Sequence, residues 1–383
     1  MSFSFFLIFC GAAVLATVAL YTRQPLLLAY IVLGGLVGPY GLAWVNDTQL
    51  ISDISKIGIV FLLFLLGLDM QPRALLHVLK KATVVTVLSA LIFGWVAYVI
   101  MRGFGYTPTE ALIAGMSATV SSTILGIKLL PTTVLHHKHT GELLVGLLLA
   151  QDFIAILALL ALAGNGTDFD PWRMSLTFLS LPILAAIAYV LVRWIFLPLI
   201  ARFDRFQEYI FLLAIGWCLG IAELSHTIGL SSEIGAFVAG IMIATSPISQ
   251  YIATALKPLR DFFLILFFFS VGASFNSALL GHILMPVTIM AAAMLALKPV
   301  VFYGLLKMQR ETGKVAWEIG FRLGHISEFS LLIAYLAVSK QLIGEEASMI
   351  IQATAILLFM LSTYLVILNY PSPIAISEKL RRD

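Results

Sequence analysis

The sequence predicts an all-α polytopic membrane protein, with about thirteen transmembrane helices arranged as two inverted repeats of six helices around one linker helix. Three observations indicate this class. Of 383 residues, 61% are hydrophobic and only 11% are charged, whereas soluble domains carry roughly 25% charged residues. The apolar residues form runs long enough to cross a hydrocarbon core of ~30 Å. Two of these runs are interrupted by polar residues at corresponding places in the two halves.

The apolar spans follow one another along almost the whole chain. The N-terminal MSFSFFLIFC lacks the positive segment of a signal peptide, so it predicts a first transmembrane helix. The expected spans are 3–20, 24–41, 54–70, 82–101, 108–128, 141–163, 174–192, 209–225, 229–245, 260–276, 283–306, 315–338 and 346–368. Their length and composition are typical of membrane-crossing helices.

Lysine and arginine are distributed unequally between alternate loops. Of the 23 Lys and Arg residues, 17 lie in one set of loops and 4 in the other, and the remaining two, Lys298 and Arg322, lie inside spans. The positive-inside rule places the first set in the cytoplasm. We therefore expect the N-terminus outside and the C-terminus inside, in a bacterial inner membrane.

The chain lacks the motifs of enzymes and of ATP-driven pumps. It contains no P-loop, HExxH motif, CxxC cluster or dinucleotide fingerprint. Its two cysteines, Cys10 and Cys218, lie in apolar spans and give neither a disulfide framework nor a metal spacing. The net charge of +3 gives no reason to expect a nucleic-acid partner. We expect no enzymatic activity and no cofactor, with the lipid bilayer as the surroundings.

Asp152 lies at the middle of the span GELLVGLLLAQDFIAILALLALA (141–163). A carboxylate near the bilayer midplane is costly and by default marks an ion or proton pathway. Its own helix face is apolar, so a partner must come from another helix or from water. Desolvation raises the pKa of a carboxyl group, and a nearby cation lowers it. A carboxyl group under both influences can hold either a proton or a metal cation near neutral pH. Asp152 is thus the candidate site for both, the alternative being a buried structural aspartate.

Gln151 and Lys298 each allow two roles beside Asp152. The carbonyl of Gln151 is a candidate ligand for a monovalent cation beside Asp152, or its amide braces a neighbouring broken helix. Lys298 lies deep in the span AAAMLALKPVVFYG, so it should be paired or titrating. It either forms an ion pair with Asp152 when no substrate is bound, or braces unwound backbone.

Polar residues occupy the centres of the fifth and twelfth spans, which predicts that both helices are discontinuous and line a transport site. In GMSATVSSTILG, hydroxyls around Thr119 and Ser122 either ligate a dehydrated cation or satisfy the unwound backbone.

The twelfth span carries ionisable groups along its length. Glu318 and Arg322 are four residues apart, so we expect them to neutralise each other. His325 and Glu328 lie deeper and are candidates for lining a cytoplasmic funnel, although a satisfied polar contact is an alternative role for His325.

Several sequence motifs, taken together, resemble the monovalent cation:proton antiporter-2 family, and in particular its Kef-type potassium/proton antiporters. The matching stretches are LGGLVGPYGL, IGIVFLLFLLGLDMQPRAL (57–75), SATVSSTILG (117–126), LLLAQDFIAI (147–156), GAFVAGIMIA (235–244), PLRDFFLILFFFSVGASF (258–275) and GHISEFSLLIA (324–334). They occur in the family's order over almost the whole chain. The Gln-Asp pair resembles the Kef-type signature, whereas many sodium/proton relatives have Asn-Asp or Asp-Asp.

The resemblance implies a sodium/proton-antiporter-like fold in which the two broken helices cross. It implies a single membrane transport domain over 1–383 that works as a homodimer by an elevator-like movement, with Asp152 as carrier and Lys298 as its basic partner. The implied parts are dimerisation helices in 1–76 and 209–276, mobile core helices in 82–163 and 283–368, and a linker helix at 174–192.

Kef-type proteins usually continue into a cytoplasmic nucleotide-binding domain, whereas this sequence ends with SEKLRRD soon after the last span. We expect no soluble regulatory domain in this chain, so such a domain or a separate subunit is a candidate partner. The hypothesis is exchange of K⁺ for H⁺, with a Na⁺/H⁺ antiporter, a gated K⁺ efflux channel and a symporter of organic anions as alternatives.

Overall fold

The protein is described by a computed structural model that covers residues 2–69, 72–131, 139–164, 171–203, 205–228, 230–246, 248–373, 375, 378, 380 and 381. Helices contain nearly all of these residues, as the sequence predicts. Seven described helices are long and apolar enough to cross a membrane, and four shorter apolar helices accompany them. The all-α membrane class is therefore confirmed, and the number of thirteen spans stays a prediction.

One set of helices packs around α13 and is called the α13 group. Its helices are α1 (Ser2–Tyr21), α2 (Leu26–Val37), α3 (Thr48–Asp69), α11 (Gln207–Thr227), α12 (Ser232–Ala244) and α13 (Ser249–Ala273). Within it, α12 packs on α3 and α11, while α13 packs on α2 and α3.

A second set packs around α14 and is called the α14 group. Its helices are α4 (Pro72–Gly103), α5 (Pro108–Ala118), α6 (Thr123–Lys128), α8 (His139–Gly164), α14 (Leu280–Met308), α15 (Gly313–Arg322), α16 (Glu328–Ser339) and α17 (Glu345–Asn369). Here α4 packs on α5, α8 and α14, and α17 packs on α14 and α16.

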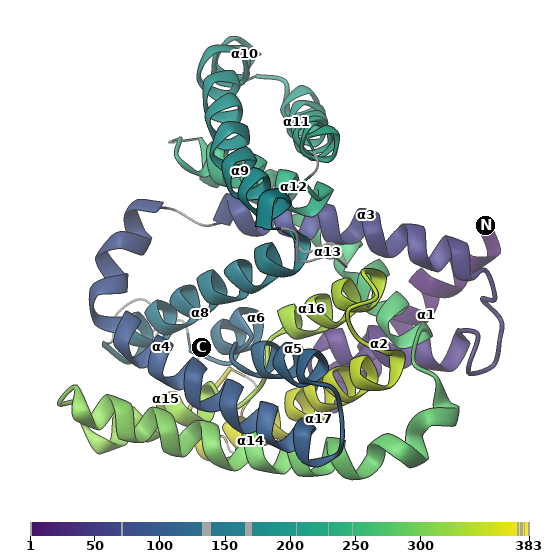
Figure 1. Cartoon of the computed structure of the whole chain (residues 1–383), viewed down its shortest axis with the longest axis vertical. Coiled ribbons are helices and arrows are strands. Elements are labelled where there is room, and N and C mark those ends of the chain that lie inside the picture. Colours follow the sequence, from purple (N-terminus) through teal and green to yellow (C-terminus); the bar gives the residue numbers. More distant parts are fainter. Residues whose placement is uncertain are drawn as a thin grey trace.

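The two groups are connected through the middle of the chain. α9 (Pro171–Leu191) packs on α12 and continues through a π-helical turn (Val192–Phe196) into α10 (Leu197–Phe203). In Figure 1, α9, α10 and α11 lie at one end of the molecule and α14 and α15 lie at the opposite end. A 3₁₀ turn, Ser277–Leu279, precedes α14.

Small residues allow α2 to approach α13 closely. A Cβ atom on Gly38 would lie 2.8 Å from the Cα atom of Ala273, and one on Gly272 would lie 2.8 Å from the carbonyl carbon of Ile31. Both distances are shorter than real Cβ contacts, so glycine is required. Gly34 and Gly38 form a GxxxG motif, and this motif serves packing of α2 on α13 within the chain.

The fifth and twelfth spans are each broken at their polar centres. α5 ends at Ala118, and α6 starts after Ser122, whose hydroxyl accepts a hydrogen bond from the backbone nitrogen of Leu125 at 3.1 Å. α15 ends at Arg322, and α16 starts after Ser327, whose hydroxyl accepts from the backbone nitrogen of Phe329 at 3.2 Å. Serine at the N-cap stabilises the new helix because it satisfies a free backbone N–H.

Candidate cation and proton site

Asp152 lies halfway along α8 and is only 2% exposed. Its Oδ2 atom accepts a hydrogen bond from the hydroxyl of Thr123, the first residue of α6, at 2.7 Å. Its Oδ1 atom is buried and has no partner among the described residues. The partner thus comes from another helix, as the apolar face of α8 requires, and one carboxylate oxygen is left for a proton or a cation.

The carboxylate of Asp152 faces a cavity of about 310 Å³ between the two helix groups, called the Asp152 cavity. Thr123, Arg260 and Glu328 are its other polar lining residues. The negative charge of Glu328 acts on Asp152. Apolar side chains complete the lining: Leu62, Leu66, Ile127, Leu149, Leu264, Phe267, Phe268, Phe329 and Leu332. The cavity therefore brings two carboxylates together in largely apolar surroundings.

Arg260 is a lining residue that the sequence did not reveal. It lies on α13, forms a 3.3 Å ion pair with Asp261, and has a side chain 33% exposed. The sequence counts it among the cytoplasmic loop charges, because hydropathy gives its depth and not its direction. The Asp152 cavity consequently contains a guanidinium group from the α13 group.

Gln151 braces the first helix break. Its Oε1 atom accepts a hydrogen bond from the backbone nitrogen of Ser121 at 3.0 Å, and its Nε2 atom has no partner within the described chain. The carbonyl that a cation would need is therefore engaged by the unwound backbone. Of the two roles that the sequence allows, this geometry favours the brace.

Lys298 joins both helix breaks. Its Nζ atom donates to the backbone carbonyl of His325 at 2.7 Å, and to the carbonyl of Val120 and the hydroxyl of Ser121 at 3.3 Å each. The ring of Phe93 lies 5.3 Å from the same nitrogen. Both Lys298 and Asp152 are described, and no ion pair joins them. The ammonium group thus neutralises carbonyl oxygens that the unwound segments leave without helical donors.

His325 ties the second break to the first. Its Nδ1 atom accepts a hydrogen bond from the backbone nitrogen of Ser122 at 3.0 Å, so this imidazole is neutral and carries its proton on Nε2. The Nε2 atom is buried without a partner in the described part of the chain. The backbone nitrogen of Ser327 also donates to the carbonyl of Val120 at 2.9 Å. The two broken helices therefore cross in direct contact, as the resemblance implies.

The hydroxyls singled out in the fifth span lie away from the Asp152 cavity. Ser122 is fully buried and caps α6. The hydroxyl of Thr119 donates to the carbonyl of Met116 at 2.8 Å, and its side chain lines an apolar groove between α4 and α5. Thr123, one residue further on, is the hydroxyl that reaches Asp152.

Arg322 lies at the end of α15 and forms the expected ion pair with Glu318, at 2.9 Å. It also donates to the backbone carbonyls of Leu129 at 2.8 Å and Pro371 at 2.7 Å. It does not line the Asp152 cavity. Its contacts hold together the ends of α15 and α6 and the segment after α17.

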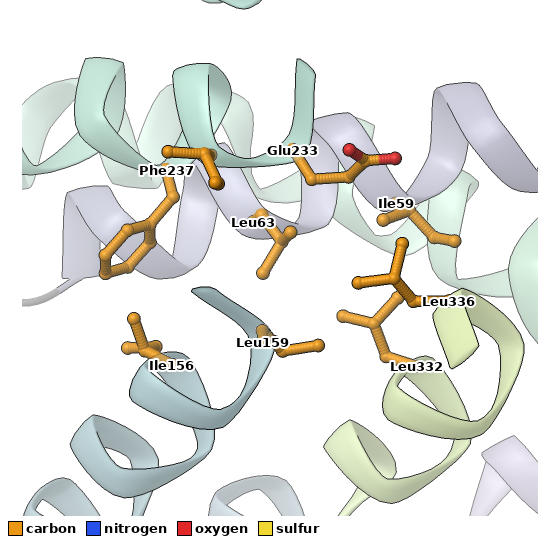
Figure 2. Close-up of a pocket in the computed structure, with 9 residues that line it drawn as sticks. Ile59, Leu63, Ile156, Leu159, Glu233, Phe237, Leu332 and Leu336 are labelled. Carbon is orange, nitrogen blue, oxygen red and sulfur yellow. The ribbon is translucent and has the colours of Figure 1, made fainter. Parts of the chain in front are cut away.

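An apolar layer closes the Asp152 cavity toward the other end of α8 and α16. It leaves only about 20 Å³, room for about one water molecule. Figure 2 shows side chains of α3 and α12 facing those of α8 and α16 across this space. The layer consists of eight apolar residues and one glutamate: Ile59, Leu63, Ile156, Leu159, Ile234, Phe237, Leu332, Leu336 and Glu233. Because most of its side chains are apolar and the space between them is so small, a bare ion would cross the layer only at high cost.

Comparison with known proteins places this geometry among ion transporters. A family model described as sodium/hydrogen exchanger, transmembrane, matches residues 5–368. The iron transporter MagA of Paramagnetospirillum magneticum is 28% identical over 89% of this chain and 79% of that protein. K(+) efflux antiporter 4 of Arabidopsis thaliana is 30% identical over 87% of this chain, which spans 58% of the antiporter.

Among solved structures, the sodium proton antiporter MjNhaP1 of Methanocaldococcus jannaschii at pH 8 has the same fold. Its TM-score is 0.69 at 15% sequence identity, with 94% of both chains covered. An identity this low bears on the fold alone.

Proposed function

Because the chain belongs to the sodium/hydrogen exchanger family, we propose that it is an antiporter that exchanges K⁺ for H⁺ across a bacterial inner membrane. It acts as a transporter and not as an enzyme, and it needs no cofactor besides the ions that it moves. The observation that carries the proposal is that Asp152 lines the Asp152 cavity and that its buried Oδ1 atom has no partner among the described residues.

The exchange follows from the cost of moving charge through apolar surroundings. Asp152 crosses the membrane neutralised, either by a proton or by a bound cation, because a bare carboxylate is heavily penalised in the apolar layer. Thr123 orients the carboxylate in both states. One proton therefore moves for each monovalent cation.

We assign Gln151 and Lys298 to the crossing and not to the transported ions. Gln151 holds the backbone of Ser121, and Lys298 holds three oxygen atoms of the two breaks. Lys298 then keeps its charge throughout, and exchange is electroneutral. Glu328 contributes negative charge that attracts a cation into the Asp152 cavity.

The two helix groups provide the moving parts. The α14 group carries Asp152 and both broken helices, and it meets the α13 group at the Asp152 cavity and the apolar layer. We propose that the α14 group slides against the α13 group in an elevator-like movement, and that the α13 group forms a homodimer. The distribution of lysine and arginine among the loops places the Asp152 cavity, lined by Arg260, toward the cytoplasm.

K⁺ is favoured over Na⁺ by the Gln-Asp pair and by the plant relative, which is named as a K(+) efflux antiporter. One relative is named as an iron transporter, so the transport assay described next compares Fe²⁺ with K⁺ and Na⁺.

Proteoliposomes with an internal pH dye test the proposal. We expect that external K⁺ drives proton efflux in the wild type, more strongly than Na⁺ or Fe²⁺, and that Asp152→Asn abolishes it. Asp47→Asn makes the same chemical change at an exposed position and should leave exchange intact. Unchanged exchange in Asp152→Asn would contradict the proposal, and large single-channel currents would indicate a channel.

A further inference from the structure

A second polar cavity lies beyond the apolar layer from Asp152. It measures about 340 Å³ and is called the Gln352 cavity. α16 runs past the Asp152 cavity, the apolar layer and the Gln352 cavity in turn. Glu328 lines the first, Leu332 and Leu336 belong to the second, and Ser339 lines the third. The eleven residue steps from Glu328 to Ser339 rise ~16 Å along the helix, so the two cavities lie on opposite sides of the layer.

Gln352 presents an unused oxygen atom there. Its side chain is 8% exposed, and its Nε2 atom donates to the hydroxyl of Ser348 at 2.9 Å. With the amide in this orientation, the Oε1 atom is buried and has no partner in the described residues. Gln352 therefore brings an amide to the wall of a polar cavity with room for about ten waters, where a small rotation of the side chain offers its oxygen to a water or a cation.

The charges around the cavity favour a cation over an anion. Glu345 lines it from an exposed position at the start of α17, and no lysine, arginine or histidine is among its lining residues in the described chain. The remaining polar groups that line it are serine and tyrosine hydroxyls. Carbonyl, carboxylate and hydroxyl oxygens are the ligands that hard cations prefer.

The predicted repeat is a separate reason to expect the two cavities on opposite sides of the membrane. α8 and α17 hold the sixth spans of the two inverted repeats, so they run through the membrane in opposite senses. Asp152 on α8 and Gln352 on α17 each face a cavity, one on each side of the apolar layer. Inverted repeats run equivalent helices in opposite senses, so α8 and α17 are expected to serve opposite faces of the membrane.

We propose that the Gln352 cavity binds a hydrated monovalent cation, with the Oε1 atom of Gln352 as a protein ligand, on the side of the membrane opposite to the Asp152 cavity. The cation occupies this site before Asp152 binds it on that side of the membrane, or after Asp152 releases it there. The site rests on the proposed function only in taking its occupant to be the transported ion.

Cysteine labelling tests the site without relying on transport. In a Cys10→Ser, Cys218→Ser background, Met349→Cys places a thiol in the Gln352 cavity, and Leu264→Cys places one in the Asp152 cavity. Membrane-impermeant methanethiosulfonates, one cationic and one anionic, are added to either side of sealed vesicles. We expect the two thiols to react from opposite sides, and Met349→Cys to prefer the cationic reagent beyond its intrinsic reactivity.

K⁺ at constant ionic strength should slow the labelling of Met349→Cys by the factor 1 + [K⁺]/Kd, which is about elevenfold at ten times Kd. Gln352→Leu should abolish this protection, and Gln352→Glu should strengthen it. Thr354→Val is the matched control, because Thr354 lies on α17 outside the cavity, and it should keep the protection.

Equal labelling by both reagents, or protection by K⁺ that survives in Gln352→Leu, would overturn the proposal. Asp152→Asn separates it from the proposed function. If that variant still exchanges ions while Met349→Cys is protected by K⁺, the function fails and the site stands. If exchange depends on Asp152 but K⁺ gives no protection, the site fails and the function stands.

Discussion

The Nζ atom of Lys298 lies 2.7 Å from the backbone carbonyl oxygen of His325, where it is held at the crossing of the broken helices. Since Asp152 takes no part in this arrangement, Lys298 and Asp152 have separate tasks. Lys298 organises the backbone, and Asp152 exchanges its ligand. Changes at the two residues should therefore have different measurable effects.

Exchange by the wild type should not respond to membrane potential. A Lys298 ammonium that stays bonded to backbone oxygens neither gains nor loses a proton when Asp152 changes ligand, so no net charge crosses. The measurement is the rate of K⁺-driven proton flux in liposomes clamped at opposite potentials. A rate that follows the potential would show that a second group titrates.

Replacing Lys298 by methionine should destabilise the protein more than it changes ion affinity. The carbonyl oxygen of His325 would stay buried without this donor, at a cost of about 1–3 kcal/mol, whereas the carbonyl of Val120 keeps the backbone N–H of Ser327. We expect a clearly lower thermal midpoint in detergent, with a smaller loss for Lys298→Arg. The account fails on this point if Lys298→Met unfolds at the wild-type temperature.

His325→Leu and His325→Asn should differ in stability. Leucine removes the acceptor for the backbone N–H of Ser122, whereas the asparagine Oδ1 atom takes the place of the imidazole Nδ1 atom. We expect His325→Leu to lose about 1–3 kcal/mol of stability and His325→Asn to recover most of it. Equal losses in chemical unfolding would mean that ring packing matters and the hydrogen bond does not.

Thr123→Val should raise the apparent KM for K⁺ roughly tenfold. The hydroxyl of Thr123 donates a hydrogen bond to the carboxylate of Asp152. A hydrogen bond to a charged group contributes about 1.5–3 kcal/mol. Without it the ionised carboxylate is less stable, so protons compete better with the cation. Thr123→Ser keeps the donor and serves as control. Steady-state exchange at fixed pH measures the effect, and an unchanged KM would contradict it.

Arg260→Gln should lower the apparent KM for K⁺ a few-fold on one side of the membrane only. The guanidinium lines the Asp152 cavity, and its removal leaves two carboxylates there without that opposing charge. Lys257→Gln removes a charge from an exposed position on the same helix and should change nothing. The apparent KM on each side is measured by adding K⁺ to right-side-out or to inverted vesicles. An equal change of KM on both sides would argue against this role of Arg260.

Polar residues at the centres of two spans allowed the helix breaks to be predicted from the sequence. Ser122 and Ser327 are strong N-cap residues inside apolar runs, and both cap new helices as such residues do. The burial of Asp152 was equally predictable, because its position at mid-span follows from the apolar residues on both sides of it.

Contacts between helices were less predictable. Hydropathy places Lys298 and Asp152 at similar depths, but it does not say which neighbour each one faces. Unwinding at 119–122 also breaks the helical phase, so Thr119, Ser122 and Thr123 could not be ranked by the angle between successive residues. Each pairing depends on how helices distant in the sequence pack, as the bond between Thr123 and Asp152 illustrates.

Proton release on cation binding tests the central claim most directly. K⁺ is titrated into the detergent-solubilised protein in weak buffer with a pH dye, under conditions in which Asp152 starts protonated. The account predicts saturable release that approaches one proton per K⁺ bound and is absent in Asp152→Asn. K⁺ binding without proton release, or release that persists in Asp152→Asn, would contradict the claim that one carboxylate alternates between the two ions.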